Sequence, residues 1–308
     1  MLPRWNKFAV ICLGFALLIS ACRAASPAAV PTQSQTPTAT APSQPIPPSP
    51  TLVAQTPAAA QMPTPTENTA ILFPDLEAEL IPGVDWHILI EDAQTGEILF
   101  ERSATAGFHP ASMIKIPTAM AVLSILEDQG RGLKDLKSSG IEGRSFDSLL
   151  EAMVVHSEES AADSLEYFAR GENRLRKKLD GWGLSQTKFD PRVSTAAELL
   201  TSLELLHTGQ ALNPENTHYL LELMGVYTEN DRILLGKLTE TLPGCTFFNK
   251  RGTMLSPTIV SDMGILDCGE HVWYLVIAGT PSIDSTATFE DIQASIEAFS
   301  AAFAEFVK

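Results

Sequence analysis

The sequence predicts an α+β fold, in which strands from both ends of the folded part form one antiparallel β-sheet flanked by helices, beside an all-helical lobe. Two strand-like runs lie near the start of that part, at residues 86–91 and 97–101. Three more lie near its end, at 246–250, 258–266 and 272–279, and helical patterns fill the interval. This order favours a sheet with helices on its faces. A ligand site is then expected where the two lobes meet.

The predicted elements follow one another with local start and stop signals. The first two strands surround Asp92-Ala93-Gln94-Thr95-Gly96, which is typical of a hairpin turn. The sequence Ser160-Ala161-Ala162-Asp163 matches a capping box and is expected to begin a helix. The spacing of apolar residues predicts helices, in chain order, at 75–81, 112–128, 145–156, 160–168, 174–182, 195–208, 214–224 and 289–307.

Residues 1–22 have the features of an export signal. Arg4 and Lys7 precede an apolar stretch at 8–19, which is too short to span a membrane as a helix. Ile19-Ser20-Ala21-Cys22 resembles the bacterial lipobox, in which Cys22 would be lipidated. The alternative is an ordinary cleaved signal, or a short anchor, with an incidental cysteine. We expect the lipoprotein form, exported and anchored to a membrane on the extracytoplasmic side.

Residues 23–69 are expected to be a disordered tether, which leaves 70–308 as the folded domain. The tether is rich in Pro, Thr and Ala, and such a segment cannot bury enough apolar surface to offset its ordering entropy. The whole chain has a formal net charge of −16 at pH 7. This acidity argues against a nucleic acid as partner.

The predicted domain contains two of the four cysteines, Cys245 and Cys268. A hairpin register that pairs residue 252 with residue 261 places 245 opposite 268, so a disulfide closing the hairpin is geometrically reasonable. An exported domain allows such a bridge to persist. The alternative is two buried free thiols. No His or Cys pair has the spacing of metal ligands, and we expect neither a metal nor a cofactor.

The motif Ser112-Met113-Ile114-Lys115 opens the predicted helix at 112–128. Residues three apart lie on one face of a helix, so the Ser112 hydroxyl and the Lys115 amine would be neighbours. A lysine with a lowered pKa can take the proton of a serine nucleophile, and a helix N-terminus offers N–H groups to an oxyanion. By itself, however, an S-x-x-K on a surface helix usually has no role.

Together with two further motifs in the same order, Ser112-Met113-Ile114-Lys115 resembles the class A serine β-lactamases and related penicillin-binding proteins. The resemblance covers roughly residues 70–308 and implies the fold of that serine β-lactamase/DD-peptidase-like family. Ser157-Glu158-Glu159 stands where the family has S-D-N, and Lys250-Arg251-Gly252 where it has K-T-G. The resemblance implies catalytic roles for Ser112, Lys115, Ser157 and Lys250, and substrate-binding roles for Glu159, Arg251 and Gly252.

Three departures from the family pattern shape the expected function. Glu159 replaces an Asn, and Arg251 replaces a Thr or Ser. These opposite charges predict a contact across the cleft from Arg251 to Glu159 or Glu158. There is also no room between residues 188–191 and 194–196 for the loop that carries the deacylating glutamate.

We therefore expect a monomeric serine acyl hydrolase that forms an acyl-enzyme with β-lactams, a small-molecule substrate, and hydrolyses it slowly. One alternative is a D-alanyl-peptide carboxypeptidase or penicillin-binding protein. The other is a catalytically degenerate envelope lipoprotein that binds peptidoglycan.

Overall fold

The structure, a computed structural model, describes residues 74–225 and 233–308, all within one compact unit that comprises residues 63–308. The predicted signal peptide, Cys22 and most of the predicted tether and domain boundary lie outside the described residues. None of the helices within the described ranges combines the length and the apolar character needed to cross a membrane.

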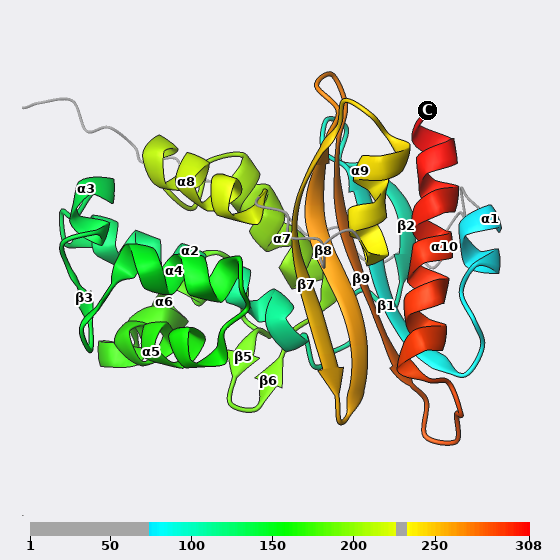
Figure 1. Cartoon of the computed structure of the whole chain (residues 1–308), viewed down its shortest axis with the longest axis horizontal. Helices are drawn as coiled ribbons and strands as arrows, with labels where there is room; N and C mark the ends of the chain where they lie inside the picture. Colours follow the sequence, from blue (N-terminus) through cyan, green and yellow to red (C-terminus); the bar gives the residue numbers. More distant parts are fainter. Residues whose placement is uncertain (1–73, 226–232) are drawn as a thin grey trace, which may run out of the picture. The chain divides into compact units, whose positions relative to one another are not determined.

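A five-stranded antiparallel sheet joins the two ends of the domain, as predicted (Figure 1). Its strand order is β2-β1-β9-β8-β7. The N-terminal strand β1 pairs along its whole length with the C-terminal strand β9, from Val84 opposite Pro281 to Asp92 opposite Trp273. The strands are β1 (Val84–Asp92), β2 (Ile98–Arg102), β7 (Thr246–Leu255), β8 (Thr258–Asp267) and β9 (Val272–Pro281). Strand β7 lies at the edge nearest the helical lobe.

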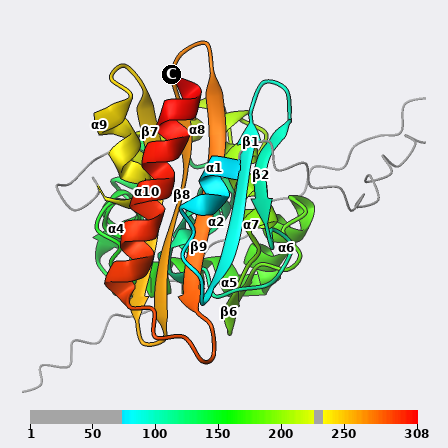
Figure 2. The ribbon, with the colours of Figure 1, turned by 90° about the vertical axis from the view of Figure 1, so that its right-hand side faces the viewer.

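Helices cover both faces of this sheet. On one face, α10 (Phe289–Val307) runs along the strands next to α1 (Pro74–Ala78), as Figure 2 shows. The short helices η4 (Leu234–Lys237) and α9 (Leu238–Thr241) complete that layer. The other side carries the helical lobe, formed by α2 (Lys115–Asp128), α3 (Leu133–Leu136), α4 (Phe146–Val154), α5 (Glu159–Arg170), η2 (Gly171–Asn173), α6 (Arg174–Gly181), α7 (Ala196–His207) and α8 (Pro214–Met224).

The central strands are buried on both faces because each face has its own hydrophobic core. Successive side chains of a strand point to opposite faces. On β9, Leu275 and Ile277 belong to the core that includes Ile296 and Phe299 of α10. Val276 between them belongs to the core of the helical lobe. The helical lobe therefore packs against one face of the sheet, and α10 packs against the other.

Helix α2 is the central helix of the lobe, and it is buried along nearly its whole length. All of its residues from Lys115 to Leu126 are buried, and it packs against α4, α5, α6 and α7. A helix that is apolar all round is a core helix rather than a surface one. Its first residue, Lys115, is consequently buried as well.

Two predicted helix starts were wrong. The α-helix expected from Ser112 begins at Lys115, since residues Ala111–Ile114 form a separate 3₁₀ turn, η1. Helix α5 begins at Glu159 rather than at Ser160, and Glu158 occupies its N-cap position. The Ser160 hydroxyl donates to the Glu158 carboxylate instead of capping the helix.

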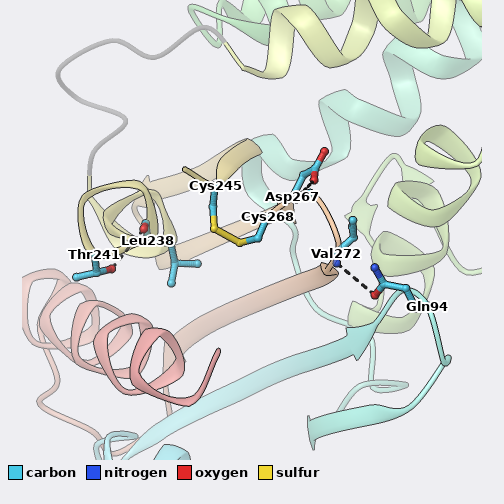
Figure 3. Close-up of a disulfide and its surroundings, with 8 residues drawn as sticks. Gln94, Leu238, Thr241, Cys245, Asp267, Cys268 and Val272 are labelled. Atoms are coloured by element: carbon cyan, nitrogen blue, oxygen red, sulfur yellow. Dashed lines mark hydrogen bonds between the residues drawn. A yellow bond between two sulfur atoms is a disulfide. The ribbon is translucent and has the colours of Figure 1, made fainter. Parts of the chain in front are cut away.

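A Cys245–Cys268 disulfide closes the β7–β8 hairpin, which confirms that prediction (Figure 3). The strands pair with Gly252 opposite Ser261, the register from which the bridge was predicted. The disulfide lies at the end of the hairpin away from the Ser256-Pro257 turn. It therefore fixes the register of the strand that carries Lys250 and Gly252.

Candidate functional site

Ser112 lies half-buried in η1, where the edge strand β7 passes close to it. The closeness depends on Gly252, because a Cβ added there would lie 2.8 Å from the Pro110 carbonyl oxygen and 3.1 Å from the Ser112 nitrogen. Ala111, which precedes the serine, has a positive φ of 47°. The turn thus sets the Ser112 amide beside a strand backbone, an arrangement that suits stabilisation of an oxyanion by backbone N–H groups.

Lys115 is fully buried, and its ammonium group makes three hydrogen bonds. The Nζ atom donates to the Ser157 carbonyl oxygen at 2.7 Å, to Ser157 Oγ at 3.2 Å and to Glu159 Oε1 at 2.6 Å. A lysine ammonium has three N–H donors, so these acceptors use all of them. Burial lowers the pKa of Lys115, and this effect outweighs the contact with Glu159, which raises it.

Ser157 lies in the loop between α4 and α5, as its motif predicted, and points both of its oxygens at Lys115. Its backbone has a positive φ of 56°, which is uncommon for a residue other than glycine. Residues held in such conformations cluster at functional sites, where the surrounding structure over-determines them. The predicted catalytic partners Lys115 and Ser157 are therefore in direct contact.

Glu159, the first residue of α5, is bound by two cations. One oxygen lies 2.6 Å from Lys115 Nζ and the other 3.0 Å from Arg192 Nη1. Burial acts to raise the pKa of Glu159, but Lys115 and Arg192 together outweigh it and hold that pKa below its ordinary value. Glu159 is consequently a charged acceptor in a position where the family has a neutral amide.

The predicted contact of Arg251 with Glu159 or Glu158 was wrong, because both carboxylates bind other cations. Glu158 binds Arg144, with Oε1 2.6 Å from Nη1, and Glu159 binds Lys115 and Arg192. The alternation of side chains along β7 explains the error, since Arg251 lies opposite Asp262 of β8, on the face where Asn249 donates to the Asp262 carboxylate. Lys250, by contrast, lies opposite Met263, on the face of the helical lobe.

A short hairpin replaces the loop that would carry a deacylating glutamate. Strand β5 (Lys188–Phe189) pairs with β6 (Arg192–Val193) across a turn that contains a cis Asp190–Pro191 bond. The sequence predicted that the longer loop is missing, but it did not predict a role for Arg192. No motif singles this arginine out, and only the fold of the hairpin brings it to Glu159.

The assembled site can therefore supply a nucleophile and a proton relay. η1 contributes Ser112, α2 the buried Lys115, the α4–α5 loop Ser157, and β7 the backbone at Gly252. Lys250 is buried on the same strand. No group of three or more His, Cys, Asp or Glu among residues 74–225 and 233–308 is arranged to hold a metal ion.

Comparison with known proteins shows which family this architecture belongs to. The model of the beta-lactamase enzyme family matches residues 77–296, more than half of the chain. No curated protein sequence matches the chain significantly.

Several solved structures share the fold at low sequence identity. The TLA-3 extended-spectrum beta-lactamase has a TM-score of 0.64 at 17% identity, over 77% of this chain and 98% of that one. An ancestral class A beta-lactamase has a TM-score of 0.61 at 22% identity, over 75% and 97%. A PBP-A mutant, solved as an acyl-enzyme complex with penicillin G, has a TM-score of 0.57 at 19% identity, over 73% and 92%.

Proposed function

The chain belongs to the beta-lactamase enzyme family, and from this premise we propose that it is an active-site serine hydrolase that forms an acyl-enzyme with β-lactams and releases it slowly. One observation carries the proposal: a fully buried lysine, Lys115, lies one helical turn from Ser112 and binds Ser157 through both of that residue's oxygens. A buried amine in contact with a hydroxyl can move a proton along that contact.

In the acylation step, Ser112 Oγ attacks the carbonyl carbon of the β-lactam. The Oγ–C bond forms and the lactam C–N bond breaks, while the Oγ proton passes to the neutral amine of Lys115. Ser157 gives its own proton to the leaving nitrogen and receives one from Lys115. The step needs Lys115 in its neutral form, which burial favours. The backbone N–H of Ser112 stabilises the oxyanion of the intermediate.

We infer that deacylation lacks the base that the loop glutamate of the family would supply. The β5–β6 hairpin is too short to carry a glutamate over the serine, and Glu159 is a weak substitute. Both of its oxygens are engaged by cations, and its pKa lies below the ordinary value, so it has little tendency to take a proton from water. We therefore expect the acyl-enzyme to accumulate.

Intact-mass spectrometry after incubation with penicillin G tests this proposal. The wild-type protein is expected to gain the mass of one penicillin, and the Ser112→Ala variant none. The adduct should persist well after free penicillin is removed. Absence of an adduct with several β-lactams would overturn the assignment of Ser112. Fast hydrolysis without a detectable adduct would overturn the slow release.

One observation favours a second candidate, a protein that binds peptidoglycan without catalysis. Lys115 directs all three of its N–H donors to Ser157 and Glu159. In such a resting site the proposed base, Lys115, is already hydrogen-bonded to residues other than the nucleophile. If Ser112→Ala leaves binding to peptidoglycan unchanged and no adduct forms on the wild type, this second function is the correct one.

We also propose that the mature protein is a lipoprotein, lipidated at Cys22 and spaced from the membrane by the Pro-rich tether. The motif Ile19-Ser20-Ala21-Cys22 supports this location. Fractionation should find the wild type with membranes and the Cys22→Ser variant released from them. A Cys22→Ser variant that stays membrane-bound would contradict the proposal.

A further inference from the structure

Arg192 is a charged residue of the site to which the proposed function gives no role. Its side chain is mostly buried, with 20% of its surface exposed, and it pairs with two carboxylates. Nη1 lies 3.0 Å from Glu159 Oε2, and Nη2 lies 3.5 Å from Glu166 Oε1. Glu166 is in turn held by Arg170, at 3.2 Å. Arg192 thus links the pair at the lysine to a second, buried carboxylate on α5.

The backbone around Arg192 is anchored, so its position is a property of the fold rather than of one flexible side chain. Phe189 pairs with Arg192 across the hairpin. The next residues are fixed by a bridge in which Ser194 and Phe108 exchange backbone hydrogen bonds of 2.9 Å. The residues before the hairpin are fixed by the buried carboxylate of Glu198, which accepts hydrogen bonds from Thr187 N at 2.6 Å and Thr187 Oγ1 at 2.7 Å.

The charges in this cluster bear directly on the lysine. A carboxylate 2.6 Å from an amine favours the charged amine, because the ion pair is lost when the amine is deprotonated. Glu159 alone would therefore oppose the neutral form that acylation needs. Arg192 offsets it. Arg192 gives Glu159 a cationic partner that stays in place when Lys115 is neutral. Burial raises the pKa of Glu166, an effect that Arg192 and Arg170 oppose and that the charge of Asp163 reinforces.

We propose that Arg192 is a positioning residue for acylation: it shares the Glu159 carboxylate with Lys115 and so prevents Glu159 from holding the lysine in its charged form. The proposal rests on the proposed function, because it concerns the base that serves Ser112. Burial has the largest influence on the pKa of Lys115 and lowers it. Glu159 and Glu166 act to raise that pKa, while Arg192 acts to lower it.

Other charged groups face the same cluster and belong to the argument. His109 precedes η1, and burial together with the charge of Arg192 lowers its pKa. Glu159 acts to raise the pKa of His109, so His109 is subject to the same two charges as Lys115. Lys250, on β7, is unchanged in all of the variants. Because Glu159→Gln and Arg192→Gln also change the electrostatics at His109, the titration of Lys115 itself is the readout that isolates the lysine.

The pH dependence of the acylation rate tests the proposal, because Glu159→Gln and Arg192→Gln should shift it in opposite directions. Glu159→Gln removes a charge that favours the ammonium form, so the acidic limb of the profile should move to lower pH. Arg192→Gln removes the second cation that binds Glu159, so Glu159 stabilises the ammonium form of Lys115 more strongly. The acidic limb should therefore move to higher pH. At a fixed pH on the limb, each rate should differ from the wild type by about two- to fivefold, the range expected for a partly exposed charge pair.

The chain offers a matched control in Arg144→Gln. This substitution breaks an Arg–Glu pair at the neighbouring residue, Glu158, which makes no ion pair with Lys115 in the described residues. It should leave the limb in place. Arg192→Lys keeps the charge and should return the limb toward the wild-type position. A purely structural role of Arg192 would lower the rate at every pH without moving the limb.

A second measurement separates this proposal from the proposed function. The ¹³Cε resonance of Lys115, assigned by comparison with Lys115→Arg, reports the titration of the amine without any acylation. Opposite shifts of this titration in Glu159→Gln and Arg192→Gln would support the role of Arg192 even if no adduct ever forms. An Arg192→Gln titration that is unmoved, or moved to lower pH, would overturn it. If Arg192→Gln does not fold, an unmoved titration in Glu159→Gln overturns it equally.

Discussion

Asp262 is predicted to make the stability of the protein depend on pH in a direction opposite to that of most carboxylates. It is fully buried on β8, where its carboxylate accepts hydrogen bonds from Asn249 Nδ2 at 3.0 and 3.2 Å. Burial raises the pKa of Asp262 from 3.8 to about 7, although Asn249 and the charge of Arg251 act to lower it. The folded protein therefore holds this proton more tightly than the unfolded chain does.

The sign and size of the effect follow from that difference. Below pH 3.8 the carboxyl group is protonated in both states and its stabilising contribution is fully present. As the pH rises toward about 7, the unfolded chain loses the proton while the folded protein keeps it, so the free energy of unfolding falls. One pKa unit corresponds to about 1.4 kcal/mol. A rise from 3.8 to about 7 thus removes about 4 kcal/mol, and the loss is complete above about pH 7.

Asp262→Asn removes this titration, because an amide stays neutral at every pH. Urea unfolding between about pH 4 and pH 8, followed by the fluorescence of the buried Trp86 and Trp273, measures the effect. The stability of the variant relative to the wild type should rise by about 4 kcal/mol across this range, whatever constant offset the new amide introduces. Asp284→Asn, at an exposed loop position, serves as control. Parallel pH curves for the wild type and Asp262→Asn would refute the reasoning.

Two further variants probe the β7–β8 hairpin, which carries the K-T-G-like motif. Gly252→Ala would force a methyl group to within 2.8 Å of the Pro110 carbonyl oxygen. It should cost about 1–3 kcal/mol of stability, as overpacking does, and should abolish adduct formation. A variant with full stability and a normal acylation rate would show that β7 need not lie so close to η1. Replacing Cys245 and Cys268 by Ser removes a bridge with a sequence separation of 23, and should lower the free energy of unfolding by about 3 kcal/mol. An unchanged urea midpoint would contradict the stabilising role of the bridge.

The sequence by itself determined the fold class and the order of the motifs. Strand-like runs at both ends of the domain predicted the five-stranded sheet, because pairing those runs buries them together in one layer. The register of the β7–β8 hairpin and its disulfide were also predictable, since the cysteines lie at matching distances from the turn. The S-x-x-K motif with its two companions predicted Ser112, Lys115, Ser157 and Lys250 as catalytic candidates, and the structure brings Lys115 and Ser157 into contact. All of these signals are local in the chain or repeat with the period of a strand or helix.

Only the tertiary structure decided which charges meet in the site. Glu159 was predicted to bind Arg251, but the pleat of β7 turns Arg251 toward Asp262, while a short hairpin elsewhere in the chain brings Arg192 to Glu159. The same packing buries Lys115 and gives its three N–H donors their acceptors. Ion pairs between residues far apart in sequence leave no periodic signal, because they depend on where whole elements come to rest. The electrostatic environment of Lys115 is therefore a property of the fold, although the lysine itself could be found in the sequence.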